Sequence, residues 1–454
     1  MKTFKNLLVA SLSTLALIPA CGESNSDLPI DAPVIPVVDA PIAGGNVDVP
    51  AGDISGDTTW LAKNTYILKG QVFFTSGTLT IEPGTVIKGD AGSVLTITKN
   101  AKLNAVGTVD KPIVFTSSAA VAKSGDWGGL VMLGSAPINV TGGSNKVEGF
   151  PDTVGIKTEY GGAVADSDCG KLKYARIEYA GFQLAVDNEL NGLTLGGCGA
   201  ATLVDYVQVH LGLDDGIEIF GGNTNISHVV ITQPDDDALD WDLGWNGKAQ
   251  FVIVQQKTGR GDKGFEADSN RNNNDALPRS SPEIWNATLI GGDGAITDKQ
   301  GGMHLRRGSG AKLNNMIVAY FSTFAIDVDG ASSAALWPNN GLSVANTYFM
   351  KPAIGELWPA NFDVVANKEN DCDSTGTNCF NEATMIAGVA SNHMTSDPML
   401  TAPKNITAPN WMPMAGSPVL TGCGTPPAGL DQTATFCGAV GATDWTTGWT
   451  RFPQ

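Results

Sequence analysis

Apolar and polar residues alternate with a period of two along most of the chain from about residue 58, which indicates short β-strands. Helical periodicity is nearly absent from this region. Glycine occupies 55 of the 454 positions, and Gly, Asn and Asp separate the apolar runs, as turn residues do. The pattern therefore predicts an all-β chain made of many short strands.

Five segments repeat one pattern, in which an apolar strand is followed by a turn and a second strand. The first strands are "YVQVHLG" (206–212), "HVVITQP" (228–234), "FVIVQQK" (251–257), "NATLIGG" (286–292) and "NMIVAYF" (315–321). The second strands are "DGIEIF" (215–220), "DALDWD" (237–242), "KGFEAD" (263–268), "GGMHLR" (301–306) and "FAIDVD" (324–329). Repeats of roughly 22 to 25 residues with two or three short strands are typical of a parallel β-solenoid.

The first twenty residues have the pattern of a secretory signal. Lys2 and Lys5 precede an apolar run, 7–18, and small residues precede Cys21. The run is too short to span a membrane. Residues 21–57 are rich in Pro, Asp, Ala and Gly and have no amphipathic period, so we expect an extended acidic tether. We expect the repeats to fill 58–400 and residues 401–454 to form a C-terminal cap.

Charge and cysteine content indicate in which compartment the protein works and which partners it can bind. The net charge is −18, and removing Lys2 and Lys5 makes it −20, so we expect no binding to nucleic acid. With Cys21 set aside, six of the seven cysteines remain, an even number that suits disulfides in an oxidising compartment. Proximity along the chain favours three pairs among fifteen possible pairings: Cys169–Cys198, Cys372–Cys379 and Cys423–Cys437.

Stacking the repeats brings acidic residues together. In "PDDDALDWD" (234–242), five of nine residues are carboxylates. One outward position of the second strand reads, coil by coil, Thr194, Glu218, Asp240, Glu266, His304 and Asp327. Two residues further on, the position reads Phe220, Asp242, Asp268, Arg306 and Asp329. Just before the strand lie Asp214 and Asp215, then Asp236 and Asp237, then Asp262 and Lys263.

Like charges about 5 Å apart repel, and three arrangements would relieve the repulsion. A hard cation such as calcium could bind to Glu218, Asp240, Glu266 and Asp268. Some acids could have raised pKa values, as general acid catalysis requires. The groups could also spread into solvent, balanced by Lys263, Arg306 and Arg307. We favour cation or ligand binding, with Glu218, Asp240, Asp242, Trp245 and Arg307 as ligand-binding residues.

Catalysis at the same place is an alternative. A lyase needs a base, for which Lys263, Arg306 and Arg307 are candidates, and a cation. A hydrolase needs two carboxylates. Asp215 with Asp236 or Asp237, or Glu218 with Asp240, could provide them. His304 is a candidate proton shuttle or an ion-pair partner of the acids.

Several longer motifs resemble bacterial surface lipoproteins with a right-handed parallel β-helix, of the pectin-lyase-like superfamily. They include "LTIEPGTVIKG" (79–89), "GDWGGLVMLGSAPIN" (125–139), "WMPMAGSPVL" (411–420) and "GATDWTTGWTRF" (441–452). The sequence around Cys21 resembles a lipobox, which implies acylation of that cysteine. The superfamily includes polygalacturonases; "GLDDGIEIF" (212–220) has their "DD", while their NTD, GHG and RIK motifs are missing here.

The sequence thus predicts a right-handed parallel β-helix that is lipid-anchored to the bacterial outer membrane. Its acidic, calcium-assisted face is expected to bind an extracellular polysaccharide. The alternatives are a polysaccharide lyase or glycoside hydrolase at the same face and a structural or adhesive surface rod. The missing motifs favour a binding protein over an enzyme.

Overall fold

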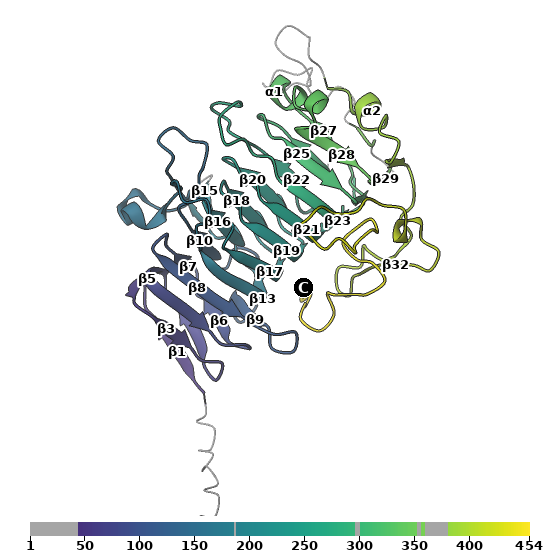
Figure 1. Ribbon diagram of the computed structural model, residues 1–454. Helices are drawn as coiled ribbons and strands as arrows, with labels where there is room; N and C mark the ends of the chain where they lie inside the picture. Colours follow the sequence, from purple (N-terminus) through teal and green to yellow (C-terminus); the bar gives the residue numbers. More distant parts are fainter. Residues whose placement is uncertain (1–43, 186–187, 296–299, 352–355, 359–379) are drawn as a thin grey trace, which may run out of the picture. The chain divides into compact units, whose positions relative to one another are not determined.

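The computed structural model describes residues 44–454 except 186–187, 296–299, 352–355 and 359–379. Short strands stack in parallel, coil upon coil, so that strands far apart in the sequence lie side by side (Figure 1). The all-β, parallel β-helix prediction is confirmed. No helix within the described ranges is long and apolar enough to cross a bilayer.

Two ladders of parallel strands, which we call face A and face B, form the coils, and the long strand β5 (Gln71–Ile81) contributes to both. Face B also contains β2 (Gly52–Ser55), β7 (Val94–Ile97), β10 (Leu130–Leu133), β16 (Leu193–Gly196), β18 (Ile217–Phe220), β20 (Leu239–Asp242), β22 (Lys263–Ala267), β24 (Gly301–Leu305) and β27 (Asp327–Val328).

Face A carries the longer strands. It contains β1 (Asn46–Val49), β3 (Thr58–Trp60), β4 (Thr65–Leu68), β6 (Val86–Gly89), β8 (Ala101–Val106), β9 (Ile113–Ser117), β13 (Gly170–Glu178), β17 (Leu203–His210), β19 (Asn225–Thr232), β21 (Lys248–Gln255), β23 (Glu283–Ile290), β25 (Ala311–Asn314), β26 (Ile317–Ala319), β28 (Leu342–Ala345), β29 (Tyr348–Met350) and β30 (His393–Met394).

The remaining elements are short. Three antiparallel pairs are β11 (Asn145–Lys146) with β12 (Glu159–Tyr160), β14 (Gln183–Ala185) with β15 (Asn188–Glu189), and β31 (Leu400–Ala402) with β32 (Asn410–Pro413). The helical turns are η1 (Asp152–Thr158), α1 (Ala331–Ala334), η3 (Trp337–Asn339), α2 (Glu382–Met385) and η4 (Pro418–Leu420).

The inside of each coil is apolar because every second strand residue points inward. On face B one inward ladder runs through equivalent positions that are all fully buried: Ile217, Leu239, Phe265 and Met303. Burial of one such side chain contributes about 1.5–3 kcal/mol. A single coil cannot exclude water from these residues, so stacking is what makes them a core.

Face A bends at one position in each coil. The residue at the bend has a left-handed backbone in β13, β17, β19, β21 and β23, with φ of 46°, 55°, 50°, 60° and 54° at Tyr174, Tyr206, His228, Phe251 and Asn286. This conformation is uncommon for residues other than glycine. The first four rings stack on one another with centroids 4.1–4.7 Å apart, which offsets part of its cost.

The C-terminal segment lies along the outside of face A (yellow in Figure 1). Gln208 holds Arg451 by two hydrogen bonds, donated by Gln208 Nε2 and by the Arg451 N–H. Gln250 holds Asp431 in the same way. Trp449 and other apolar residues of the segment pack on outward residues of face A. Residues 401–454 thus cover one side of the middle and later coils.

Two of the three predicted disulfides are confirmed. Cys169–Cys198 and Cys423–Cys437 have Cα–Cα distances of 5.7 and 5.6 Å. Cys372 and Cys379 lie outside the described residues, as do the signal segment, Cys21 and most of the tether.

Candidate functional site

The register of face B brings the predicted acidic positions onto neighbouring strands. Glu218 of β18 pairs with Asp240 of β20, Asp240 with Glu266 of β22, Glu266 with His304 of β24, and His304 with Asp327 of β27. We call these five positions the acidic column. In earlier coils the same position holds uncharged residues, Val131 and Thr194. The charged part of the column therefore begins at Glu218.

A long connection covers the start of the column. Residues 134–162 follow β10, and Ile138, Val147 and Tyr160 pack against Phe220 and other outward residues of face B. Glu218 is consequently only 6% exposed, although it points away from the core of the coils. The sequence predicted that these acidic residues point outward from the coils, and the covering connection makes this first part of the column a buried site.

Asp215, Glu218 and Asp240 form the acid-only cluster. Each offers a carboxylate oxygen, and these three oxygens lie within 4.8 Å of one another. Asp215 is 7% exposed, and Asp240 is partly exposed. No ion pair joins any of the three to a lysine, arginine or histidine within the described ranges. One amide, Asn191 Nδ2, donates to Glu218 Oε2 over 2.6 Å.

The electrostatics of this cluster favour protons or cations. Burial and the neighbouring Asp214 raise the pKa of Asp215 well above its usual value. Burial and Glu148 raise the pKa of Glu218 well above its usual value. Burial and Glu218 likewise raise the pKa of Asp240. The adjacent Asp242 has its pKa raised to about 7, by burial first and by Asp268 second. Each ionised group thus makes ionisation of the next less favourable.

Asp215 and Asp237 also hold the turns before the strands. Asp215 Oδ1 accepts the Asp237 N–H at 2.9 Å, and Asp237 Oδ1 accepts the Lys263 N–H at 2.5 Å. Each carboxylate thereby fixes the turn of the next coil. Burial and Glu266 raise the pKa of Asp237 well above its usual value. The candidate hydrolase pair Asp215 and Asp237 therefore has a structural role in addition to any chemistry.

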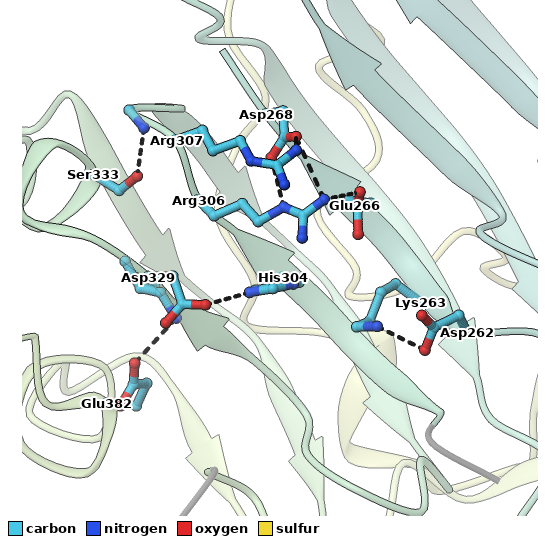
Figure 2. A network of polar contacts seen from close by, with 12 residues as sticks. Asp262, Lys263, Glu266, Asp268, His304, Arg306, Arg307, Asp329, Ser333 and Glu382 are labelled. Carbon is cyan, nitrogen blue, oxygen red and sulfur yellow. Dashed lines mark hydrogen bonds and ion pairs between the residues drawn. The ribbon is translucent and has the colours of Figure 1, made fainter. Parts of the chain in front are cut away.

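Glu266, Asp268, Arg306 and Arg307 form the arginine-paired cluster, shown in Figure 2. Arg306 donates through Nε to Asp268 at 2.8 Å and through Nη2 to Glu266, and Arg307 donates to Asp268. Burial raises the pKa of Glu266, against the opposing effect of Arg306. The predicted metal ligands thus divide in two: Glu218 and Asp240 are free of arginine, whereas Glu266 and Asp268 are neutralised by it.

The structure shows which partners hold Lys263, Arg306 and His304, the basic residues that the sequence offered for catalysis. Lys263 Nζ lies 2.6 Å from Asp262. Although burial opposes protonation, Asp237 and Asp262 raise the pKa of Lys263, so it stays charged at neutral pH and is unsuited to be a base. Arg306 and Arg307 are held by carboxylates. His304 Nε2 lies 2.5 Å from Asp329 Oδ2. Because burial lowers the pKa of His304 well below its usual value, this contact is a hydrogen bond of a neutral ring and not the ion pair that the sequence offered as one alternative.

The prediction that Trp245 binds a ligand is wrong. Its side chain is fully buried in the core of the coils. Its indole N–H donates to the Thr224 carbonyl at 3.0 Å, and its ring lies 5.8 Å from that of Trp241. Gly244, with φ of 96°, turns the chain so that the following side chain points inward. Trp245 therefore cannot contact a ligand at the acidic column.

Asn191, Glu148 and Tyr160 were missed by sequence reasoning. A signal existed for Asn191, because "NGLTLG" (191–196) aligns with "DGIEIF" (215–220) in the repeat, and the Gly192 N–H donates to the Asp215 carbonyl. Glu148 and Tyr160 lie in the covering connection, which has no counterpart in the other repeats. No local pattern indicated that this connection reaches the column.

The parallel coils define a β-helix of the kind found in polysaccharide-active proteins. A scan against protein families matches residues 52–412 to the family described as "Pectate-lyase like beta helix domain". The chain belongs to this family. Searches of curated proteins and of solved structures found no match. The family supports a polysaccharide-related function, and the fold is compatible with polysaccharide binding.

Proposed function

We propose that the chain is a lipid-anchored cell-surface protein that binds an extracellular acidic polysaccharide with the help of calcium at the acid-only cluster. The observation that carries the proposal is the convergence of Asp215, Glu218 and Asp240, three carboxylates that the stacked coils bring together and that pair with no arginine or lysine in the described part of the chain. The anchor rests on the lipobox-like sequence at Cys21. It leads us to propose the bacterial outer membrane as the location.

Calcium suits this cluster because it takes six to eight oxygen ligands. The three carboxylates would supply some of them, and water or the carboxylates of a uronic-acid polymer would supply others. Asp240 is partly exposed, so the cluster has a side that a solvent-borne polymer can approach. A cation bound there would attract an anionic polymer to a protein whose net negative charge otherwise repels it.

Glycoside hydrolysis is the second candidate, because the raised pKa values of Asp215, Glu218 and Asp240 suit a general acid at neutral pH. Lysis by β-elimination is less well supported. It needs a neutral base, and Lys263 and Arg306 are held in ion pairs by neighbouring carboxylates. Both reactions would leave products that a binding protein does not make.

The test compares calcium and polymer binding in the wild-type protein, in E218Q/D240N and in the control D166N. Asp166 is exposed and far along the chain from the cluster. We expect calcium to bind to the wild type and D166N, and polygalacturonate to be retained only when calcium is present. E218Q/D240N should lose both. Polymer binding that is equal in EDTA and in calcium contradicts the proposal.

Enzymatic activity is assayed in the same samples, by release of reducing ends or of unsaturated uronates from a panel of uronic-acid polymers. Binding without product supports the binding protein. Turnover that E218Q or D240N abolishes, with folding retained by circular dichroism, establishes the hydrolase instead.

A further inference from the structure

A second group of possible metal ligands lies at the end of the acidic column. His304 is on β24, Asp327 is the first residue of the neighbouring strand β27, and Asp329 directly follows that strand. The three residues are 9%, 2% and 3% exposed, and one ligand atom from each lies within 4.8 Å of the others. This His304 cluster shares no residue with the acid-only cluster.

The imidazole is aimed at the carboxylates. His304 Nε2 lies 2.5 Å from Asp329 Oδ2 (Figure 2), and no described group forms a hydrogen bond with Nδ1. An imidazole nitrogen is the commonest metal ligand among protein side chains, and here it lies beside two buried carboxylates.

The ligand types differ from those of the acid-only cluster. One imidazole nitrogen with two carboxylates suits a borderline first-row cation, whereas calcium prefers oxygen alone. Three protein ligands also leave positions open for water. We propose that His304, Asp327 and Asp329 bind a first-row divalent cation, with zinc as the representative ion.

The neighbouring cations have carboxylate partners outside the His304 cluster: Arg306 and Arg307 donate to Glu266 and Asp268, and Lys263 pairs with Asp262. Zinc–ligand bonds of about 2.0–2.2 Å separate two ligand atoms by roughly 3.4 Å in tetrahedral geometry. The ring of His304 and the carboxylate of Asp329 would therefore move apart by about 1 Å when the ion enters. Such a shift is within reach of side-chain rotation.

A bound ion would stabilise β27, the last face-B strand of the described chain. β27 has only two residues, Asp327 and Val328, and pairs with β24. On its other side, Glu382 of α2 accepts the Val328 N–H at 3.1 Å. An ion shared by β24 and β27 would add a link where the ladder of hydrogen bonds is shortest.

The test uses the full chain, freed of metal by a chelator and titrated with cobalt(II), whose visible spectrum reports nitrogen and oxygen ligands directly. We expect one equivalent to bind and zinc to displace it. H304A and D329N should each raise the dissociation constant for zinc at least about 100-fold, since loss of an outer partner of a ligand already costs 10–100-fold. The control H393A replaces an exposed histidine and should bind as the wild type does.

Two results would overturn the proposal: a cobalt spectrum that H304A and D327N leave unchanged, or no zinc binding by the folded wild type at a tenfold excess of metal. D327N keeps the imidazole and the shape of the carboxylate, so it remains informative if H304A fails to fold. E218Q/D240N should keep zinc and lose calcium. If it loses neither, the calcium proposal fails while the zinc proposal stands.

Discussion

Asp240 of the acid-only cluster and Glu266 of the arginine-paired cluster occupy the same outward position on adjacent coils, yet the two clusters balance charge in opposite ways. Glu218 and Asp240 receive one neutral amide, from Asn191. Glu266 and Asp268 receive two guanidinium groups, from Arg306 and Arg307. The backbone of face B is the same in both, so the difference lies entirely in which side chain the neighbouring coil supplies.

This difference shows what a β-helix does to a repeated acid. Stacking alone brings carboxylates together at the spacing of the coils, and this spacing is unfavourable for charges. A coil that contributes arginine turns the position into part of the scaffold. A coil that contributes another acid leaves the carboxylates without a counter-charge, so that they favour binding of protons or cations. A binding site can use this property.

The largest expected effect comes from R306M, which makes the arginine-paired cluster resemble the acid-only one. It leaves Glu266 and Asp268 with one arginine fewer, and breaking a buried pair costs about 3–5 kcal/mol. We expect that loss in the free energy of unfolding, measured by urea denaturation in EDTA, and partial recovery in calcium. The control R271A, at an exposed position, should change stability by less than about 0.5 kcal/mol. If R306M lost as little stability as R271A, arginine would not be what distinguishes the two clusters.

Calcium itself should stabilise the wild type. An ion present at 100 times its dissociation constant adds about 2.7 kcal/mol to the free energy of unfolding. We expect this gain as a raised melting temperature on replacing EDTA with calcium, and we expect E218Q/D240N to lose it. D268N, in the other cluster, should keep it. An unchanged melting temperature in the wild type argues against calcium at the acid-only cluster.

Asp242 predicts a pH dependence. Its pKa is about 7 in the folded chain against an ordinary 3.8, so the folded state binds this proton more tightly than the unfolded state. The stabilisation is fully present below about pH 4 and is lost as pH rises through 7. The full shift corresponds to about 4 kcal/mol. Because Asp242 is partly exposed and solvent screens its charge, we expect D242N in EDTA to become more stable than the wild type by about 2 kcal/mol over this range. If the stability of D242N relative to the wild type fell as pH rises, the prediction would be contradicted.

The smallest expected effect comes from N191A, which removes the amide that Glu218 accepts. Loss of one buried hydrogen bond costs about 1 kcal/mol. Denaturation at pH 5 and pH 8 should show the larger loss at pH 8, where Glu218 carries more charge. A loss as large as that of R306M would mean that the neutral amide balances Glu218 as fully as arginine balances Glu266.

The register of the acidic column could be predicted from sequence because the pattern of the second strand recurs in every coil, even where a loop lengthens. Alignment of "DGIEIF", "DALDWD" and "KGFEAD" places Glu218, Asp240 and Glu266 on adjacent strands, and the structure pairs them so. The same strand pattern, in "GGMHLR", identified Arg306 as a counter-charge, with Arg307 beside it. In a solenoid, neighbours in space are the same position one repeat away, so local sequence carries long-range information.

Burial of the column could not be predicted in this way. The covering connection, residues 134–162, occurs once, and Tyr160 reaches the column through contacts that no repeat encodes. Trp245 was misplaced for a related reason. Strict alternation ends at the turn through Gly244, and beyond it the sequence gives no rule for which side chain points inward.

The C-terminal segment has a consequence for the order in which the protein can be completed. Gln208 and Tyr206 lie near the middle of the chain, but their partners Arg451 and Trp449 are among its last residues. During synthesis from the N-terminus, the apolar flank of the middle coils therefore stays uncovered until residues 401–454 have been made. A chain that stops before this segment would be not merely a shorter rod but one whose central flank is open to other chains.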